Sequence, residues 1–272
     1  MNYRHAFHAG NFADLVKHAA LLAMLARRGD GPLAIVDTHA GAGLYDLNGE
    51  AATRSVEAAA GVVRLMGEDQ VPAPLEVLRA AVRRANPKGG LRWYPGSPLL
   101  AARALAPGDS YLGFELRADD HAALTRALQG EARATAACAD GFEAAAKRIP
   151  ATGEALVLID PPFERPDDYR RIVETTREVR RRNPAARLAI WLPLKDLETF
   201  DALLRDLEPA AGEGVLVCEA RMRPLSDPLK MNGCALVIVR PPDGLADDLE
   251  AVCAWTVEAL GENGQAKVWT LN

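Results

Sequence analysis

Cysteine is scarce in this chain of 272 residues, which has only Cys138, Cys218, Cys234 and Cys253. No two of them form a Cys-x-x-Cys pair, which argues against a disulfide framework and against a cysteine zinc site. Long apolar runs are missing too, since none reaches the roughly 18 residues of a membrane span. The first residues also lack the apolar core of a signal peptide. We therefore expect a soluble protein of the reducing cytoplasm, with no membrane partner.

An excess of positive charge is also absent, because the formal net charge is −5. No global feature therefore indicates a nucleic-acid-binding protein. Locally, residues 170–187 contain seven arginines and two glutamates, which fits either a solvated helix face or a patch that tracks phosphates. The Gly-x-x-x-x-Gly-Lys motif of phosphate-binding loops is missing, which disfavours a nucleotide-hydrolysing enzyme.

A histidine metal site is not supported by the spacing of the residues. Four of the five histidines lie in the first 39 residues, namely His5, His8, His18 and His39. No cysteine lies near them and no short ligand spacing repeats, so we expect no metal. Histidines that are buried and hydrogen-bonded, or that lie near a cofactor carboxylate, fit this cluster better.

Short apolar runs alternate with helical patterns along most of the chain. The runs typical of strands cover residues 33–37, 111–115, 134–138, 155–159 and 188–192. Helical patterns between them cover residues 98–105, 119–128 and 168–182. This alternation predicts an α/β fold with a mostly parallel sheet. Further strands at 215–221, 234–239 and 266–271, with no long helix between the first two, predict an antiparallel C-terminal finish.

The interval between the first two predicted strands is far longer than one crossover requires. Residues 46–92 within it carry two amphipathic helical patterns, at 54–66 and 74–85. We interpret residues 1–272 as a single domain, with residues 46–92 as a small helical insertion. We expect the insertion to act as a lid or to face the substrate.

Acidic residues follow several predicted strands, where a parallel sheet would bring them to one edge. A glycine-rich turn, Asp37 to Gly43, follows the first strand, and its small residues let the backbone approach a ligand. Glu115 ends the second strand and suits a ribose diol, and Asp140-Gly141 ends the third and could face an adenine amine. Asp160 follows the fourth. Each acid alone is more often a helix cap, but the ordered set indicates a class I S-adenosylmethionine-dependent methyltransferase with its site at the strand ends.

The sequence Asp160-Pro161-Pro162-Phe163 can present a carboxylate, a free carbonyl and a flat ring together. Proline lacks an N–H and cannot extend the sheet, although a Pro-Pro dipeptide is also common in ordinary turns and loops. Asp160 and the Pro161 carbonyl can accept the two N–H groups of an exocyclic amine, while Phe163 stacks on the base. We therefore predict a catalytic role for Asp160, Pro161 and Phe163 on a base extruded from its helix.

Four segments of the chain resemble one known family. They are Tyr3 to His18, Asp37 to Gly43, Tyr94 to Pro98 and Asp160 to Pro162. Together they resemble the bacterial large-subunit rRNA adenine-N6 methyltransferase J family, almost end to end. The resemblance implies a Rossmann-like class I methyltransferase fold with a helical insertion. It also implies methylation of one adenine of 23S rRNA with S-adenosylmethionine as the methyl donor. We expect the protein to be a monomer.

The resemblance also implies which residues hold the ligands. The methyl donor would be held by His18, His39, Ser97, Glu115, Asp140, Gly141 and Asp160. Asp160 would be catalytic, and Tyr3, Arg4 and Lys17 would lie against the RNA. Ser97 also has an ordinary interpretation as a helix N-cap followed by proline.

Other functions stay open at this point. The family commonly has tyrosine at the position of Phe163, and Asp-Pro-Pro-Phe also resembles enzymes that methylate guanine N2. Guanine-N2 or DNA adenine methylation is therefore the alternative within the same class. A nicotinamide-dependent oxidoreductase on a Rossmann sheet is the alternative from another class.

Overall fold

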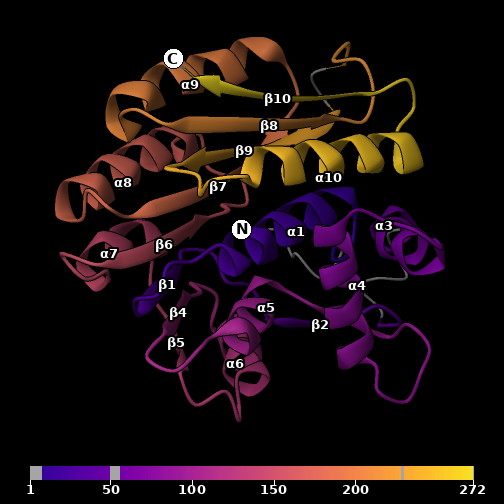
Figure 1. Ribbon diagram of the computed structural model, residues 1–272, viewed down its shortest axis with the longest axis horizontal. Coiled ribbons are helices and arrows are strands. Elements are labelled where there is room, and N and C mark those ends of the chain that lie inside the picture. Colours follow the sequence, from indigo (N-terminus) through magenta and orange to yellow (C-terminus); the bar gives the residue numbers. More distant parts are fainter. Residues whose placement is uncertain (1–7, 50–55, 228–229, 272) are drawn as a thin grey trace.

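The computed structural model describes residues 8–49, 56–227 and 230–271. These residues form a sheet between two layers of helices (Figure 1). The sheet has eight strands in the order β10-β8-β9-β7-β6-β1-β4-β5. Their bounds are β1 Leu33–Asp37, β4 Ser110–Phe114, β5 Ala134–Ala137, β6 Glu154–Ile159, β7 Arg187–Leu194, β8 Val215–Arg221, β9 Gly233–Val239 and β10 Gln265–Leu271.

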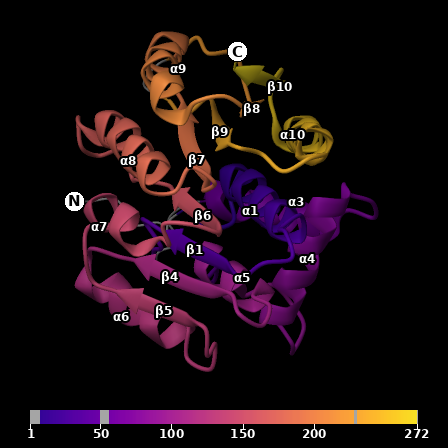
Figure 2. The ribbon, with the colours of Figure 1, turned by 60° about the vertical axis from the view of Figure 1, so that its left-hand side comes forward.

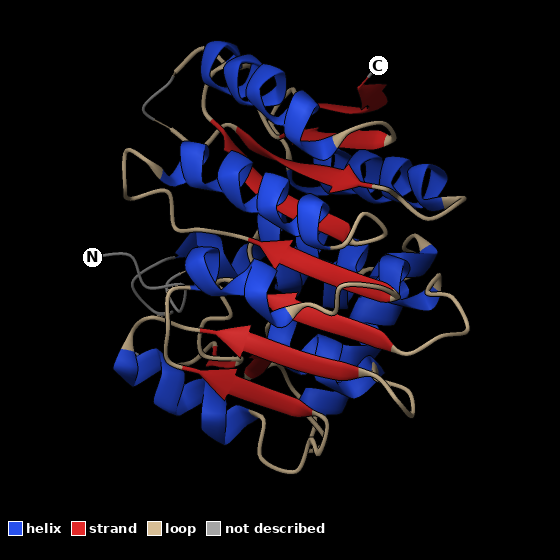
Figure 3. Cartoon of the chain, turned by 90° about the vertical axis from the view of Figure 1, so that its left-hand side faces the viewer, coloured by secondary structure: helices blue, strands red, loops and turns tan. Residues whose placement is uncertain are grey.

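Five adjacent strands, from β7 through β6, β1 and β4 to β5, are parallel. Figure 3 shows the arrowheads of the parallel strands along one edge of the sheet. β9 pairs antiparallel with both β7 and β8, and β10 pairs antiparallel with β8. The expected fold class is therefore confirmed, including the antiparallel C-terminal finish, which β8, β9 and β10 form.

Helices cover both faces of the sheet, which explains why inner strands such as β6 and β9 are near-continuous apolar runs. One face carries α1 Phe12–Ala26, α5 Ser97–Ala104, α6 Ala118–Ala127 and α10 Leu245–Leu260. The other carries α7 Gly141–Arg148, α8 Asp168–Arg182 and α9 Leu197–Ala211. Figure 2 shows α1 and α10 on one side of the strands and α8 and α9 on the other.

Two further helices of the described residues lie between β2 (Leu44–Asp46) and β3 (Trp93–Pro95), two short strands that pair antiparallel. They are α3 (Val56–Gly67) and α4 (Ala73–Ala85), and both pack against α1. The interpretation of residues 46–92 as an insertion stays a prediction. Within the described part of the chain, neither helix lines the cavity at the strand ends, so the expected role as a lid has no support from these contacts.

α1 is buried along most of its length because α4 and α10 pack against it from outside. Asn11 caps it by accepting a hydrogen bond from the backbone N–H of Asp14 at 3.0 Å. Its first half reaches the carboxyl edge of the sheet, where Lys17 and His18 line the cavity described below. A helix that is apolar on nearly all sides is expected in such a position.

Candidate active site

A cavity lies at the carboxyl ends of β1, β4, β5 and β6. It is centred where the strand order reverses, because β1 lies between β4 and β6. All seven residues predicted to hold the donor line it: His18, His39, Ser97, Glu115, Asp140, Gly141 and Asp160. The structure thus brings together residues that are far apart in the sequence, although their contact with a donor stays a prediction.

Glu115 bridges the loops that follow β1 and β4. One carboxylate oxygen accepts the backbone N–H of Gly41 at 3.1 Å, and the other accepts that of Arg117 at 2.8 Å. Burial raises the pKa of Glu115 above its ordinary value, partly offset by these N–H donors. Each carboxylate oxygen still has acceptor capacity, so the side chain can accept from two neighbouring hydroxyls.

Asp140 and Gly141 begin α7. Asp140 caps the helix by accepting from the Phe142 N–H at 3.1 Å, and it accepts from the Arg171 guanidinium at 2.8 Å. Burial alone would raise the pKa of Asp140, but Arg171 outweighs it and the pKa is lowered. A Cβ on Gly141 would lie 2.0 Å from the Thr38 carbonyl oxygen. This position therefore requires glycine, which allows the β1 and β5 loops to meet.

Ser97 takes part in a buried hydrogen-bond group rather than capping a helix. Its hydroxyl donates to Asp37 at 2.8 Å, and Tyr111 donates to the same carboxylate oxygen at 3.1 Å. Gly96 is the N-cap of α5 and Ser97 its first residue, so the interpretation of Ser97 as the cap is wrong. Burial, despite these donors, raises the pKa of Asp37 to about 6.

The two histidines of the cavity are held in fixed orientations. His18 is 1% exposed, and its Nδ1 lies 2.8 Å from the Tyr94 hydroxyl. His39 Nδ1 lies 2.7 Å from the Thr38 hydroxyl, and its ring meets Phe142 edge-on at 4.6 Å between ring centroids. Burial lowers the pKa of His39 to about 4, so its imidazole is neutral at pH 7.

Asp160 is paired with Lys17, which lies 143 residues away in the sequence. The Lys17 ammonium is 2.5 Å from Asp160 and 2.9 Å from Asp14. Burial alone would lower the pKa of Lys17, but these two carboxylates outweigh it and hold the pKa well above its ordinary value. Lys17 therefore stays charged and fixes the Asp160 carboxylate. Its predicted contact with RNA stays a prediction.

Pro161 lines the cavity and Phe163 does not. Phe163 has φ +52°, a left-handed backbone conformation that is unusual for a bulky residue and often marks a functional turn. This turn directs its ring toward Tyr169 and Trp191, with centroid separations of 5.0 Å and 5.8 Å. Tyr3 and Arg4, both predicted to contact RNA, lie outside the described residues.

Several lining residues were not predicted. Tyr45 accepts from the Ala42 N–H at 3.1 Å, and Arg171 lies over the Phe142 ring at 4.7 Å. Leu116, which follows Glu115, is 45% exposed and lines the cavity. A large apolar side chain left exposed inside a cavity suits a flat apolar ligand surface. Its position directly after the strand-end acid was the available signal for this residue.

Neither a metal-binding cluster nor a membrane-spanning helix occurs among residues 8–49, 56–227 and 230–271. Among them, no group of three or more histidine, cysteine or acidic residues could hold a metal ion. No helix in the same ranges is both long and apolar enough to cross a membrane.

This chain is similar in sequence and in fold to several known proteins. A family model described as "Ribosomal RNA large subunit methyltransferase D, RlmJ" matches residues 30–271. Ribosomal RNA large subunit methyltransferase J of Escherichia coli is 36% identical over 258 residues, 94% of this chain and 92% of the relative. The protein with the same description from Haemophilus influenzae is 30% identical over 275 residues, 100% of this chain and 98% of the relative. The crystal structure of a Legionella pneumophila protein superposes with a TM-score of 0.88 at 24% identity, covering 97% of this chain and 98% of that one. The last likeness shows a shared fold.

Proposed function

The chain belongs to the RlmJ family of ribosomal RNA large subunit methyltransferases, and from that premise we propose that it transfers a methyl group from S-adenosylmethionine to N6 of one adenine in 23S rRNA. The observation that carries the proposal is the cavity in which Asp160 lies beside the donor-binding candidates. We expect the enzyme to act as a monomer in the cytoplasm, where ribosomes are assembled.

The cavity has the groups that S-adenosylmethionine requires. Glu115 can accept from the ribose diol, and Leu116 offers an apolar surface to the adenine. Asp140 keeps its charge through Arg171 and can accept from the adenine amine. His18 lies on α1, Ser97 begins α5 and His39 follows β1. All three line the cavity, where they can hold the amino-acid end. Bound S-adenosylmethionine supplies an electrophilic methyl group on a positively charged sulfur.

Asp160 and the Pro161 carbonyl would orient the target amine. The nitrogen lone pair of adenine N6 is delocalised into the ring, so the amine must be drawn out of plane to attack. Asp160 can accept one N–H and the Pro161 carbonyl the other, which aims the lone pair at the donor methyl. The carboxylate then stabilises the positive charge that develops on nitrogen and takes up the proton, directly or through water.

Lys17 would hold Asp160 in place while this happens. An ammonium at 2.5 Å limits the orientations that the carboxylate can adopt. A carboxylate fixed in this way can accept an N–H of the neutral amine from one direction and so orient it for attack. Phe163 supplies a ring for the base, although its position outside the donor cavity means that the base would approach from the side of α8.

The nucleoside formed decides between the proposed reaction and its alternative. The protein is incubated with S-adenosylmethionine and unmodified 23S rRNA, and the digested nucleosides are analysed by mass spectrometry. We expect N6-methyladenosine. Appearance of N2-methylguanosine instead would support the alternative that Phe163 left open, and absence of any methylated nucleoside would refute the proposed function.

A further inference from the structure

Three aromatic rings cluster beside the donor cavity without lining it. Phe163 follows β6, Tyr169 lies in the first turn of α8, and Trp191 lies on β7. The Phe163 and Tyr169 rings are 5.0 Å apart and tilted by 48°. All three side chains are only partly buried, although aromatic residues make up just 6% of the chain. Partly exposed rings next to a catalytic carboxylate are available to stack on a ligand.

Tyr169 also lines a second hollow, a groove between α8 and α9. The donor cavity and this groove are neighbours, because Asp168 lines the first and Tyr169 the second. The apolar part of the groove comes from Val173 and Leu203, which are 7% and 4% exposed, and from Pro166. The Tyr169 ring therefore lies at the point where the groove meets the Phe163 ring.

The charges of the groove select a particular kind of ligand. It is lined by three arginines, Arg170, Arg177 and Arg205, and by three acids, Glu174, Glu198 and Asp206. With no excess of positive charge it is poorly suited to track a phosphate backbone. A partly exposed ring, an apolar floor and both donors and acceptors along the rim suit a nucleobase, which has a flat face and a polar edge.

We propose that Tyr169 stacks on the base of the nucleotide next to the target adenine, and that the groove between α8 and α9 holds this base. The inference rests on the proposed function, because a nucleotide adjoining an extruded base has lost its stacking partner on that side. The short separation of the two rings places this second base directly beside the one on Phe163. Arg177 and Arg205, which line the groove, can donate hydrogen bonds to the polar edge of the base that it holds.

The test uses a 23S rRNA fragment that the wild-type enzyme methylates, with 2-aminopurine at each position flanking the target in turn. Binding should quench its fluorescence at one of these positions, since 2-aminopurine stops emitting strongly when it stacks. Tyr169→Leu should abolish the quenching and lower kcat/KM for the RNA roughly 5- to 100-fold, the range expected for the loss of one base–aromatic stack. Tyr169→Phe should restore both, and the dissociation constant of S-adenosylmethionine should not change.

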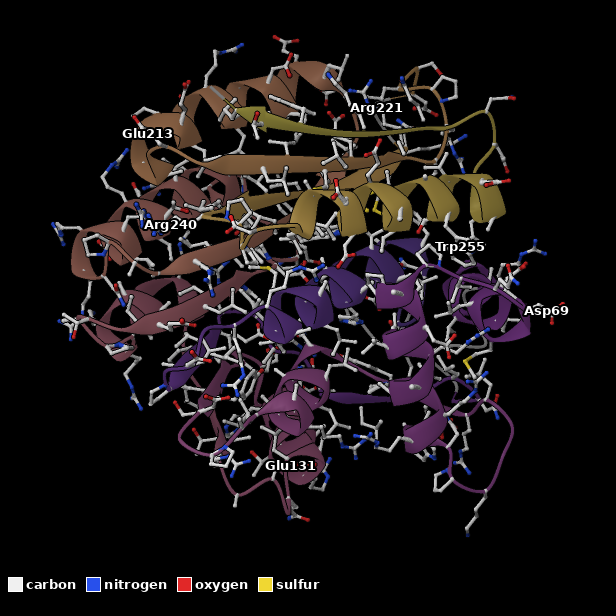
Figure 4. The ribbon with its side chains drawn as sticks, viewed as in Figure 1. Asp69, Glu131, Glu213, Arg221, Arg240 and Trp255 are labelled. Carbon is white, nitrogen blue, oxygen red and sulfur yellow. The ribbon has the colours of Figure 1, made fainter. Side chains whose placement is uncertain are left out.

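An abasic nucleotide at the same flanking position supplies a second readout. With the wild-type enzyme, the abasic RNA should lower kcat/KM by the same factor as Tyr169→Leu does. With the Tyr169→Leu enzyme, the abasic RNA should lower kcat/KM no further. Trp255→Leu is the matched control, because Trp255 lies on α10, on the opposite face of the sheet (Figure 4). Equal quenching in wild-type and Tyr169→Leu enzymes, or an abasic effect of the same size in both, would overturn the inference while leaving the methyltransferase activity intact. A wild-type enzyme that methylates no rRNA fragment would instead overturn the proposed function.

Discussion

Removal of the Lys17 charge is a sharp test of the site, because this one ammonium forms ion pairs with two carboxylates, Asp14 and Asp160. In Lys17→Met the stem is kept and the charge is lost. Asp14, 2% exposed, would then lose the Lys17 ammonium that lies 2.9 Å from its buried carboxylate, whereas Asp160, 23% exposed, can be solvated. Removing one partner of a buried ion pair costs about 3–5 kcal/mol. The Gly10 N–H still donates to Asp14 at 2.9 Å, so we expect a loss near the lower limit, about 3 kcal/mol.

The assays separate stability from catalysis. Urea denaturation should show the loss of about 3 kcal/mol, and kcat should fall about 100-fold because Asp160 is no longer held in its productive orientation. The double variant Lys17→Met/Asp14→Asn should regain most of the stability, since the buried carboxylate charge is removed together with the ammonium, but none of the activity. Lys230→Met is the control, because its pair with Asp227 is exposed and should contribute less than about 1 kcal/mol. A Lys17→Met enzyme with wild-type kcat would refute the assigned role.

Three further predictions concern the donor site and its pH dependence. Glu115→Gln should weaken S-adenosylmethionine binding about tenfold in calorimetry, as expected when a hydrogen bond to a charged group becomes neutral, and unchanged affinity would exclude the ribose role. Gly141→Ala should lower both unfolding free energy and donor affinity, because its Cβ would meet the Thr38 carbonyl at 2.0 Å; a variant as stable as wild type would contradict this packing. Burial raises the pKa of Asp37 to about 6 and lowers that of His39 to about 4. The contribution of Asp37 to the free energy of unfolding is thus complete below about pH 4 and is lost as the pH rises through 6. The contribution of His39 has the opposite dependence, because it is complete above about pH 6.5 and is lost as the pH falls through 4. Each contribution is about 3 kcal/mol, so the two nearly cancel in the wild type. In Asp37→Asn only the His39 contribution remains, and urea denaturation should therefore show a free energy of unfolding that falls as the pH is lowered. An unfolding free energy of Asp37→Asn that does not change with pH would contradict this prediction.

The strands were predictable because their physical signal is local. In the eight-stranded sheet, β1 and β8 have the predicted bounds, and the other six strands differ by one or two residues at one or both ends. The short strands β2 and β3 were not predicted. Continuous apolar runs specify strands that are buried on both faces. The helices α7, α9 and α10 were not predicted. For α9, the spacing of Phe200, Leu203, Leu204 and Leu207 was a readable helical pattern, whereas α7 has only eight residues and offers little periodicity.

The site was predictable as a set of strand ends but not as a network of contacts. Parallel strands bring their carboxyl ends to one edge, so Glu115, Asp140 and Asp160 could be expected there. The pairing of Lys17 with Asp160 depends on how α1 packs on the sheet, which no local pattern encodes. The direction of the Phe163 ring depends on one left-handed residue. Proline and glycine announce a turn in the sequence, but they do not specify which way a following phenylalanine points.

We propose that Asp160 directs methyl transfer to an adenine of 23S rRNA, and one experiment can measure this role. It is tested most directly by nucleoside mass spectrometry of 23S rRNA treated with wild-type and Asp160→Asn enzymes under the same conditions, with donor binding of both measured by calorimetry. We expect N6-methyladenosine with the wild type, and with Asp160→Asn a rate at least about 100-fold lower despite retained donor binding. Equal yields of N6-methyladenosine from the two enzymes would contradict the account.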